Sequence, residues 1–179
     1  MTFGKYVLYF ICNVDDVLLM KGLKKMVTKE IIENTLLSKA IMIATNAHGE
    51  IHQVRKGGIS LPYISHPLAV MSAVAKYGVD YMIVAVLHDY IEDTEYTLND
   101  LRDFGLSEML IDAVDAMTHR KGKESRFQYL DRVKANPIAL VVKIADIKHN
   151  SSGDMSGIDK KTVARWKIKF QEGLSYLGV

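Results

Sequence analysis

The chain has 179 residues, of which 49% are hydrophobic and 25% are charged, and its formal net charge is only +2. This is the balance of an ordinary globular protein, and the length allows one domain with a core of its own. The single cysteine, Cys12, excludes an intramolecular disulfide and any disulfide-stapled scaffold, which suits a reducing cytoplasm.

An apolar run near the N-terminus covers residues 6–14 and ends at Asp15 and Asp16. The run is too short to span a bilayer, and no small-residue cleavage site of a signal peptide follows it. We therefore expect no membrane partner. Residues 1–26 are interpreted as an extension, an edge strand or an extra helix that packs on the core or on a partner. Two later methionines leave an alternative start site open.

The charges are distributed unevenly along the chain. Residues 1–75 have a net charge of +3, residues 76–118 of −8 and residues 119–179 of +7. An acidic middle beside a basic C-terminal third would suit a cation held next to an anionic ligand. Solvated helix faces are the simpler explanation of the same pattern, so charge alone does not define a function.

Helical periodicity runs through almost the whole chain, without internal repeats or low-complexity tracts. The expected helices cover residues 28–47, 67–78, 79–92, a short segment after Thr97, 108–117, a segment ending at Lys134, 137–150 and 159–176. Residues 49–65 contain glycines and Pro62 and predict a loop, and strand signals are weak outside the N-terminal run. The prediction is an all-α bundle in which residues 27–179 form a single domain.

The expected helix starts follow from capping residues. Thr28, Thr97 and Ser107 are each placed to cap a helix, and Pro67 and Pro137 stand where a first-turn proline belongs. The predicted buried side of the first helix consists of Ile31, Ile32, Leu36, Leu37, Ile41 and Ile43. The helix over residues 79–92 is apolar nearly all round and should therefore be buried.

Four ionisable residues follow each other closely at the end of that buried helix. On a helix, His88 and Glu92 would share one face, and Asp89 and Asp93 would share the adjacent one. Burying one such group without a partner costs several kcal/mol, roughly, and a divalent cation is the simplest compensation. A lone histidine on an apolar helix is more often a hydrogen-bonded core residue, so the interpretation depends on the combination.

A second polar group follows an apolar run before residue 143. Asp146 and Asn150 are four residues apart on one helical face, and Lys143 comes three residues before Asp146. His66 stands just before Pro67 at a helix start, from where an imidazole could point into the bundle. Two imidazoles and two carboxylates suit Mn²⁺, Fe²⁺ or Zn²⁺, whereas the absence of thiolates argues against a structural zinc site.

Three strings in this order, PYISHPLAV, AVLHDYIEDTEYTLNDL and VKIADIKHN, resemble the HD hydrolase domain of the RelA/SpoT alarmone enzymes of the stringent response. The resemblance covers about residues 35–155. It implies a single HD-domain helical bundle and a manganese-dependent (p)ppGpp 3′-pyrophosphohydrolase that releases pyrophosphate. No synthetase domain follows within the 179 residues, so the expected activity is hydrolysis alone.

The resemblance also implies roles for individual residues. The metal ligands would be His66, His88, Asp89 and Asp146, and Glu92 and Asp93 would position and activate the attacking water. Arg55, Lys56 and Asn150 would bind the nucleotide, with Lys143 and Lys148 as further candidates for neutralising phosphate charge. The basic segment 118–126 resembles a stretch of the small single-domain members, where it would grip distal phosphates, and a solvated loop is an equal alternative.

Three departures from the family pattern lie where the nucleotide would be recognised. The spacing from His48 to Gln53 is longer than usual, the loop from Arg55 to Pro62 is about two residues longer, and Gly153 replaces a common hydroxyl residue. An HD enzyme for another nucleotide, such as a deoxynucleoside triphosphate, a nucleoside monophosphate or NADPH, therefore stays open.

Two further classes remain as alternatives. A non-catalytic HD module that binds a nucleotide would have no need of both the ligands and the Glu92/Asp93 pair. Nucleic-acid binding has no support from interleaved aromatic and basic residues, so we expect no nucleic-acid partner. The expected partner is a small-molecule nucleotide, and the sequence leaves a homo-oligomer open.

Overall fold

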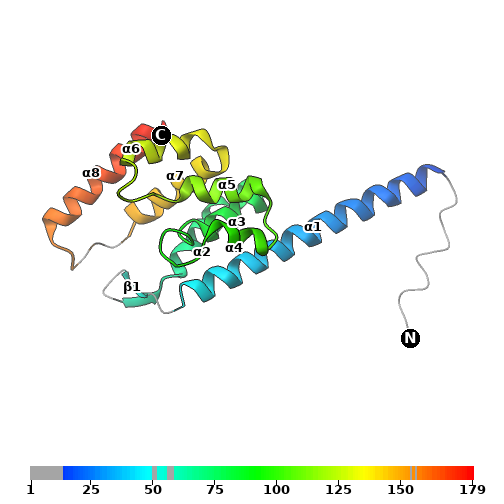
Figure 1. Ribbon diagram of the computed structural model, residues 1–179, viewed down its shortest axis with the longest axis horizontal. Coiled ribbons are helices and arrows are strands. Elements are labelled where there is room, and N and C mark those ends of the chain that lie inside the picture. Colours follow the sequence, from blue (N-terminus) through cyan, green and yellow to red (C-terminus); the bar gives the residue numbers. More distant parts are fainter. Residues whose placement is uncertain (1–13, 50–51, 56–58, 154, 156) are drawn as a thin grey trace. The chain divides into compact units, whose positions relative to one another are not determined.

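The structure is a computed structural model that describes residues 14–49, 52–55, 59–153, 155 and 157–179 (Figure 1). The chain divides into two compact units, Met1–Thr35 and Leu36–Val179, which are described separately. No helix among the described residues is long and apolar enough to cross a membrane.

The first helix, α1 (Val14–Ala47), begins well before the predicted start. Thr28 lies inside it instead of at its N-cap, because residues 17–27 contain no proline and mostly good helix formers that outweigh a single glycine. Ile31 and Ile32 are 60% and 54% exposed, so their predicted burial was wrong. The earlier apolar residues of the N-terminal run, up to residue 13, lie outside the described part of the chain.

The second unit contains the end of α1 and all the remaining elements. These are β1 (His52–Arg55), β2 (Ile59–Pro62), α2 (Ser65–Val74), the 3₁₀ turn η2 (Ala75–Tyr77), α3 (Val79–Leu87), α4 (Leu98–Asp103), α5 (Glu108–Met117), α6 (Arg126–Ala135), α7 (Pro137–Ser151) and α8 (Lys160–Leu177). The predicted all-α bundle is confirmed, with one small hairpin added to it.

The helix starts after α3 agree with their capping residues. Thr97 and Asp100 form a capping box at α4, and Asn136 caps α7, in which Pro137 is the first residue. Ser107 occupies the N-cap position of α5 without a side-chain capping bond. Asp159 accepts a hydrogen bond from the Thr162 amide at the start of α8. Local capping therefore fixes most of the boundaries that the sequence predicted.

The predicted loop over residues 49–65 contains an antiparallel hairpin. Strand β1 pairs with β2 in a register that places His52 opposite Pro62 and Arg55 opposite Ile59. The glycine pair at 57–58 between two short runs is a typical hairpin signal, which the loop interpretation did not use. The hairpin leads directly into α2.

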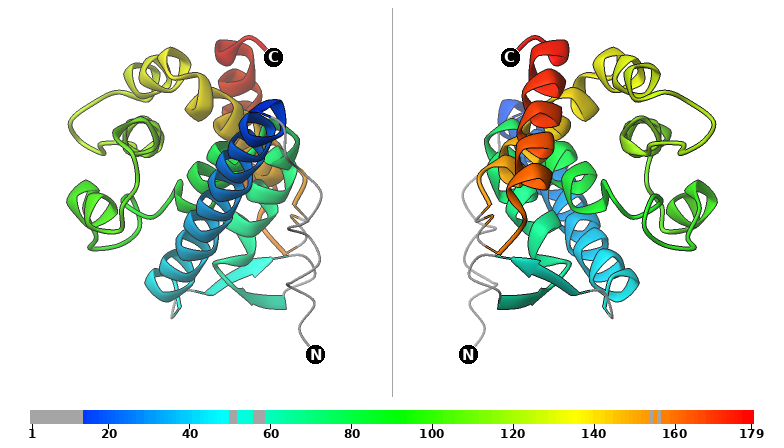
Figure 2. Two further views of the ribbon diagram at one scale, coloured as in Figure 1. Left: turned by 90° about the vertical axis from the view of Figure 1, so that its right-hand side faces the viewer. Right: turned by 90° about the vertical axis from the view of Figure 1, so that its left-hand side faces the viewer.

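Helix α3 is the centre of the core. Its residues 83–87 are at most 1% exposed, which confirms the predicted burial. Helices α2 and α7 pack against it. Helix α7 also contacts α6 and α8, so it connects the pair α2 and α3 with the pair α6 and α8 (Figure 2). The end of α1 contributes Ala40, Ile43 and Ala44 to the same core.

Helix α3 ends at Leu87, five residues earlier than predicted, and turns follow it. The His88 ring lies at hydrogen-bonding distance from the Ala85 carbonyl through Nδ1, which supplies a partner for one of the last helical carbonyls. The Tyr90 amide then donates to Leu87 in a tighter turn. The stretch 88–93 is therefore not a straight continuation of the helix.

Candidate metal centre

The structure brings the four predicted metal ligands together in the interior. His66 comes from the first turn of α2, His88 and Asp89 follow α3, and Asp146 lies on α7. His88 Nε2 lies 2.9 Å from Asp89 Oδ2, and His66 Nε2 lies 3.1 Å from Asp146 Oδ1. Both cross-distances, His66 to Asp89 and His88 to Asp146, are 3.8 Å. Ligand atoms of His66, His88 and Asp89 all fall within 4.8 Å of one another.

The orientation of His88 fits a metal ligand. Its Nδ1 lies 2.7 Å from the Ala85 carbonyl, which can only accept, so this nitrogen carries the ring proton. The other nitrogen, Nε2, is directed at the carboxylates, and its 2.9 Å approach to Asp89 does not have hydrogen-bond geometry. Among the described residues it has no hydrogen-bond partner. A buried imidazole nitrogen that faces two carboxylates in this way suits a divalent cation.

The electrostatics of the cluster also favour a cation. Burial opposes a charged His88, yet Asp89 and Asp146 outweigh it and raise the pKa of His88 to about 9. Without a cation the ring therefore also holds a proton on Nε2, and a cation bound there would displace it. Burial likewise opposes the ionised form of Asp89, but His88 lowers its pKa to about 2. The pKa of Asp146 lies well below its usual value because Lys143 and the two histidines outweigh its burial. Buried carboxylates that stay ionised create a field that a divalent cation would neutralise.

Two predicted substrate-binding residues contact Asp146. Lys143 Nζ lies 2.9 Å from Asp146 Oδ2, and Asn150 Nδ2 donates to Asp146 Oδ1 at 2.6 Å. Burial opposes the charge on Lys143, but Asp146 and Tyr129 raise its pKa above the usual value. Both residues therefore orient this carboxylate from the same helix.

The predicted catalytic carboxylates have different surroundings. Glu92 Oε1 lies 2.9 Å from Lys121 Nζ, and Glu92 Oε2 accepts a hydrogen bond from the His119 amide. Asp93 is more exposed than Glu92. The partial burial of its carboxyl group and then the nearby charges of Asp89 and Glu92 raise the pKa of Asp93. Glu92 is thus anchored to the segment that follows α5, whereas Asp93 is not.

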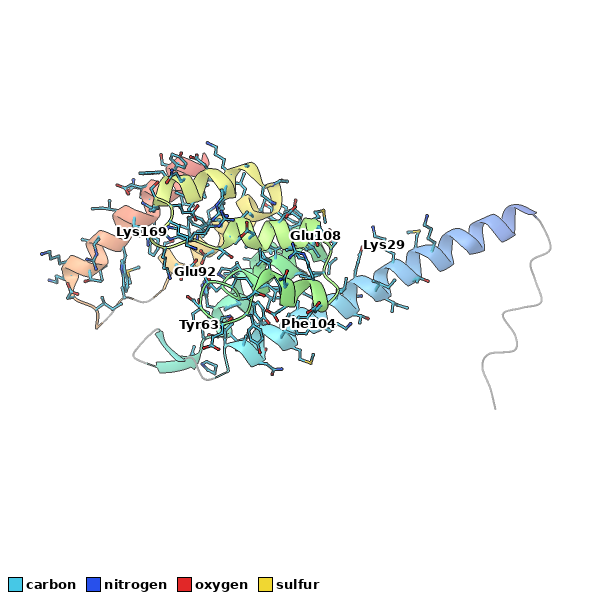
Figure 3. The ribbon with its side chains drawn as sticks, in the orientation of Figure 1. Lys29, Tyr63, Glu92, Phe104, Glu108 and Lys169 are labelled. Atoms are coloured by element: carbon cyan, nitrogen blue, oxygen red, sulfur yellow. The ribbon has the colours of Figure 1, made fainter. Side chains whose placement is uncertain are left out.

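Tyr63 joins a candidate ligand to a candidate catalytic residue, and the sequence did not single it out. Its hydroxyl donates to Asp89 Oδ2 and lies 3.3 Å from Asp93 Oδ2. Tyr63, which is labelled in Figure 3, follows β2, whereas Asp89 and Asp93 follow α3, so the hydroxyl reaches these carboxylates from a different element. Burial and then Asp89 raise the pKa of Tyr63, which keeps its proton available for donation. The only sequence signal is its place three residues before His66.

A cavity of about 340 Å³ lies next to the cluster, between α6, α7 and α8. Glu92, Asp146 and Asn150 line it on the side of the cluster. The side chains of His119, Arg126, Lys143 and Lys169 line it as well. An acidic cluster beside cationic side chains suits an anionic ligand held next to a cation.

Another predicted binding residue, Lys148, is not among the residues that line this cavity. Lys148 lines a separate hollow together with Lys76 and Tyr77. Arg55 ends strand β1, and Lys56 lies outside the described residues. Their roles toward a substrate remain predictions.

The basic segment 118–126 has local partners for several of its charges. Arg120 Nη2 lies 2.7 Å from Asp115, and Arg126 Nη1 lies 3.0 Å from Glu172. Glu124 accepts from Arg132, which lowers the pKa of Glu124 to about 2. The segment is thus folded against its neighbours, with Lys121 directed at Glu92.

Three curated proteins are similar to this sequence. The GTP pyrophosphokinase of Streptomyces coelicolor is 37% identical over 123 residues, 64% of this chain and 14% of that protein. The bifunctional (p)ppGpp synthase/hydrolase SpoT of Escherichia coli is 30% identical over 157 residues, 80% of this chain and 22% of SpoT. A guanosine-3′,5′-bis(diphosphate) 3′-pyrophosphohydrolase of Haemophilus influenzae is 36% identical over 120 residues, 61% of this chain and 17% of that protein. No family profile matches the chain.

A solved structure has the same fold. It is described as a metazoan ortholog of SpoT that hydrolyzes ppGpp, and it superposes with a TM-score of 0.68 at 16% identity, covering 80% of this chain and 85% of that one. The bundle is therefore an HD-type helical domain. The sequence matches confirm that the chain is related to the RelA/SpoT enzymes. It spans only 14–22% of the length of those curated relatives.

Proposed function

We propose that this chain is a metal-dependent nucleotide phosphohydrolase that removes the 3′-pyrophosphate of (p)ppGpp. The observation that carries the proposal is the convergence of His66, His88, Asp89 and Asp146. Asp93 is joined to Asp89 by the Tyr63 hydroxyl, and Glu92 lines the same cavity as Asp146. A non-catalytic module would not require these two additional carboxylates. The relatives named above act on the same class of guanosine nucleotide, which supports the choice of substrate.

The four clustered side chains would hold one divalent cation, Mn²⁺ in the first instance and Fe²⁺ or Zn²⁺ as alternatives. When bound, such a cation would activate water and stabilise negative charge on phosphoryl oxygens. In this proposal Lys143 and Asn150 keep Asp146 oriented toward the cluster. Asn150 also lines the cavity, so its amide is placed to contact a ligand there as well.

The chain's own acid–base groups would carry the proton transfers. Glu92 or Asp93 takes a proton from a water molecule while the oxygen of that water bonds to the phosphorus attached to O3′. The O3′–P bond breaks, O3′ takes up a proton, and pyrophosphate leaves while the 5′-phosphorylated guanosine remains. Arg55, Lys56 and the cationic side chains of the cavity would neutralise the phosphates.

Hydrolysis of a different nucleotide is the second candidate. A Cβ at Gly153 would meet only the Asn150 carbonyl among the described residues, at 3.6 Å, so a hydroxyl side chain would fit at this position. The sequence has glycine instead, which leaves space and one fewer hydrogen-bonding group beside Asn150. This difference from the alarmone hydrolases keeps hydrolysis of another nucleotide as the second candidate.

The choice of substrate leads to a kinetic prediction. With Mn²⁺ present, kcat/KM for ppGpp should exceed the values for GTP, dATP and NADPH by at least about tenfold, or about 1.4 kcal/mol of transition-state stabilisation. Released pyrophosphate, inorganic phosphate and the nucleotide products should be measured for each substrate. A value for ppGpp no higher than the others would reject the alarmone assignment, while hydrolysis of any of them would retain the reaction type.

A further prediction concerns Tyr63. Tyr63→Phe removes the hydroxyl that joins Asp89 to Asp93 but keeps the ring contact with His48, whose centroid is 4.9 Å away. We expect kcat to fall about 10–100-fold, as for other groups that orient metal ligands, with KM little changed. Tyr176→Phe is the matched control, because it removes a tyrosine–aspartate hydrogen bond to Asp131 that joins α8 to α6 and involves none of the candidate ligands. Equal activities of the two variants would contradict the positioning role.

A further inference from the structure

His149 lies against a candidate metal ligand from the side away from the cluster. Its Nδ1 is 2.8 Å from His66 Nδ1, and the two ring centroids are 4.9 Å apart at an interplanar angle of 35°. His149 is on α7, three residues after Asp146, so the helix presents both side chains toward α2. In such a contact one ring nitrogen donates the hydrogen bond and the other accepts it.

The two candidate histidine ligands therefore have different partners behind them. His88 uses the Ala85 carbonyl, which can only accept, and this fixes the proton on Nδ1. His66 faces another imidazole, and its Nε2 lies 3.1 Å from Asp146 Oδ1. Each ring nitrogen of His66 therefore faces its own partner, Nδ1 facing His149 and Nε2 facing Asp146. A cation at Nε2 requires the ring proton of His66 to be on Nδ1.

We propose that His149 is a positioning residue that accepts a hydrogen bond from His66 Nδ1 and directs the Nε2 lone pair of His66 at the metal. This inference rests on the proposed metal site. The bond orients the ring and keeps its ligating nitrogen unprotonated, as carbonyl and carboxylate partners do at other histidine ligands. His149 contacts neither the substrate nor the metal in this role.

Two substitutions at position 149 separate the hydrogen bond from the bulk of the side chain. In His149→Asn, the side-chain oxygen is as many bonds from the backbone as Nδ1 of histidine, so the acceptor is retained. In His149→Leu, the volume is largely retained and the acceptor is lost. Both variants leave Asp146 and Asn150 unchanged on the same helix.

The first measurement is the affinity of the metal-free full chain for Mn²⁺. The electron paramagnetic resonance signal of free Mn²⁺ reports how much of the ion remains unbound during the titration. We expect His149→Leu to raise the Kd by about 10–100-fold, and His149→Asn to stay within about threefold of the wild type. Wild-type affinity in His149→Leu, or equal weakening in both variants, would overturn the proposal.

The second measurement needs no variant and uses the Zn²⁺-loaded wild type, which is diamagnetic. Nitrogen-resolved spectra should show a ring proton on His66 Nδ1 with a scalar coupling to His149 Nδ1 across the hydrogen bond. A His66 that carries its proton on Nε2 would overturn the proposal, even if His149→Leu fails to fold. Neither readout involves nucleotide hydrolysis, so a wild type that binds Mn²⁺ without cleaving ppGpp rejects only the proposed function.

Discussion

Replacing Asp146 by Asn is expected to abolish metal binding and to reduce ppGpp hydrolysis to background. Asp146 is 4% exposed and is the only one of the four candidate ligands on α7. The amide keeps the size of the side chain but has no charge to balance a divalent cation. Elemental analysis after Mn²⁺ loading should give one ion per chain for the wild type and none for the variant. A variant that retains one ion would remove Asp146 from the ligand set.

The same substitution should also destabilise the metal-free protein. The Lys143 side chain is only 20% exposed and lies 2.9 Å from Asp146 Oδ2, so the change leaves a largely buried ammonium without its carboxylate. Breaking such a pair costs about 3 kcal/mol, which urea unfolding would measure.

The matched control is the double variant Asp146→Asn/Lys143→Met, which removes both charges of the pair. It should recover most of the unfolding free energy without recovering metal. That result would separate the loss of the ligand from the loss of stability. If the double variant is as unstable as Asp146→Asn alone, the unpaired ammonium is not the cause.

The sequence was sufficient to predict the helical bundle and to identify the four candidate ligands as one set, because both predictions depend on local patterns. Thr97 and Pro137 mark the starts of α4 and α7 at the positions where the structure has them. His66, His88 and Asp89 lie at helix ends and Asp146 follows the apolar run within α7, so that each is conspicuous next to apolar residues. His66, His88 and Asp146 are indeed buried at these positions.

The residues behind the ligands could not be predicted in this way. Tyr63 meets Asp89 across 26 residues of sequence, and His149 meets His66 across 83. No helical or strand periodicity relates positions so far apart, since their contact depends on how α2, α3 and α7 pack. The early end of α3 was also missed, because the contact of the His88 ring with the Ala85 carbonyl is not indicated by any periodic pattern.

The remaining large effect is expected at the two carboxylates that follow the ligands. Glu92→Gln and Asp93→Asn should each lower kcat by about 10²–10⁴, which is typical for loss of a general acid–base group. Neither residue is among the four candidate ligands, so the fold and the bound metal should survive. Circular dichroism, elemental analysis and kcat for ppGpp would be measured on each variant.

The structure makes a control necessary for Glu92. Its carboxylate holds Lys121 and the His119 amide, so Glu92→Gln could act by loosening that segment and not by removing a proton acceptor. Lys121→Met removes the ion pair while leaving Glu92 and its bond to the His119 amide in place. If Glu92 takes the proton, Lys121→Met should lower kcat by less than about tenfold. A loss as large as that of Glu92→Gln would make Glu92 an anchor of the segment, and near-normal activity in both carboxylate variants would assign the proton transfer to another group.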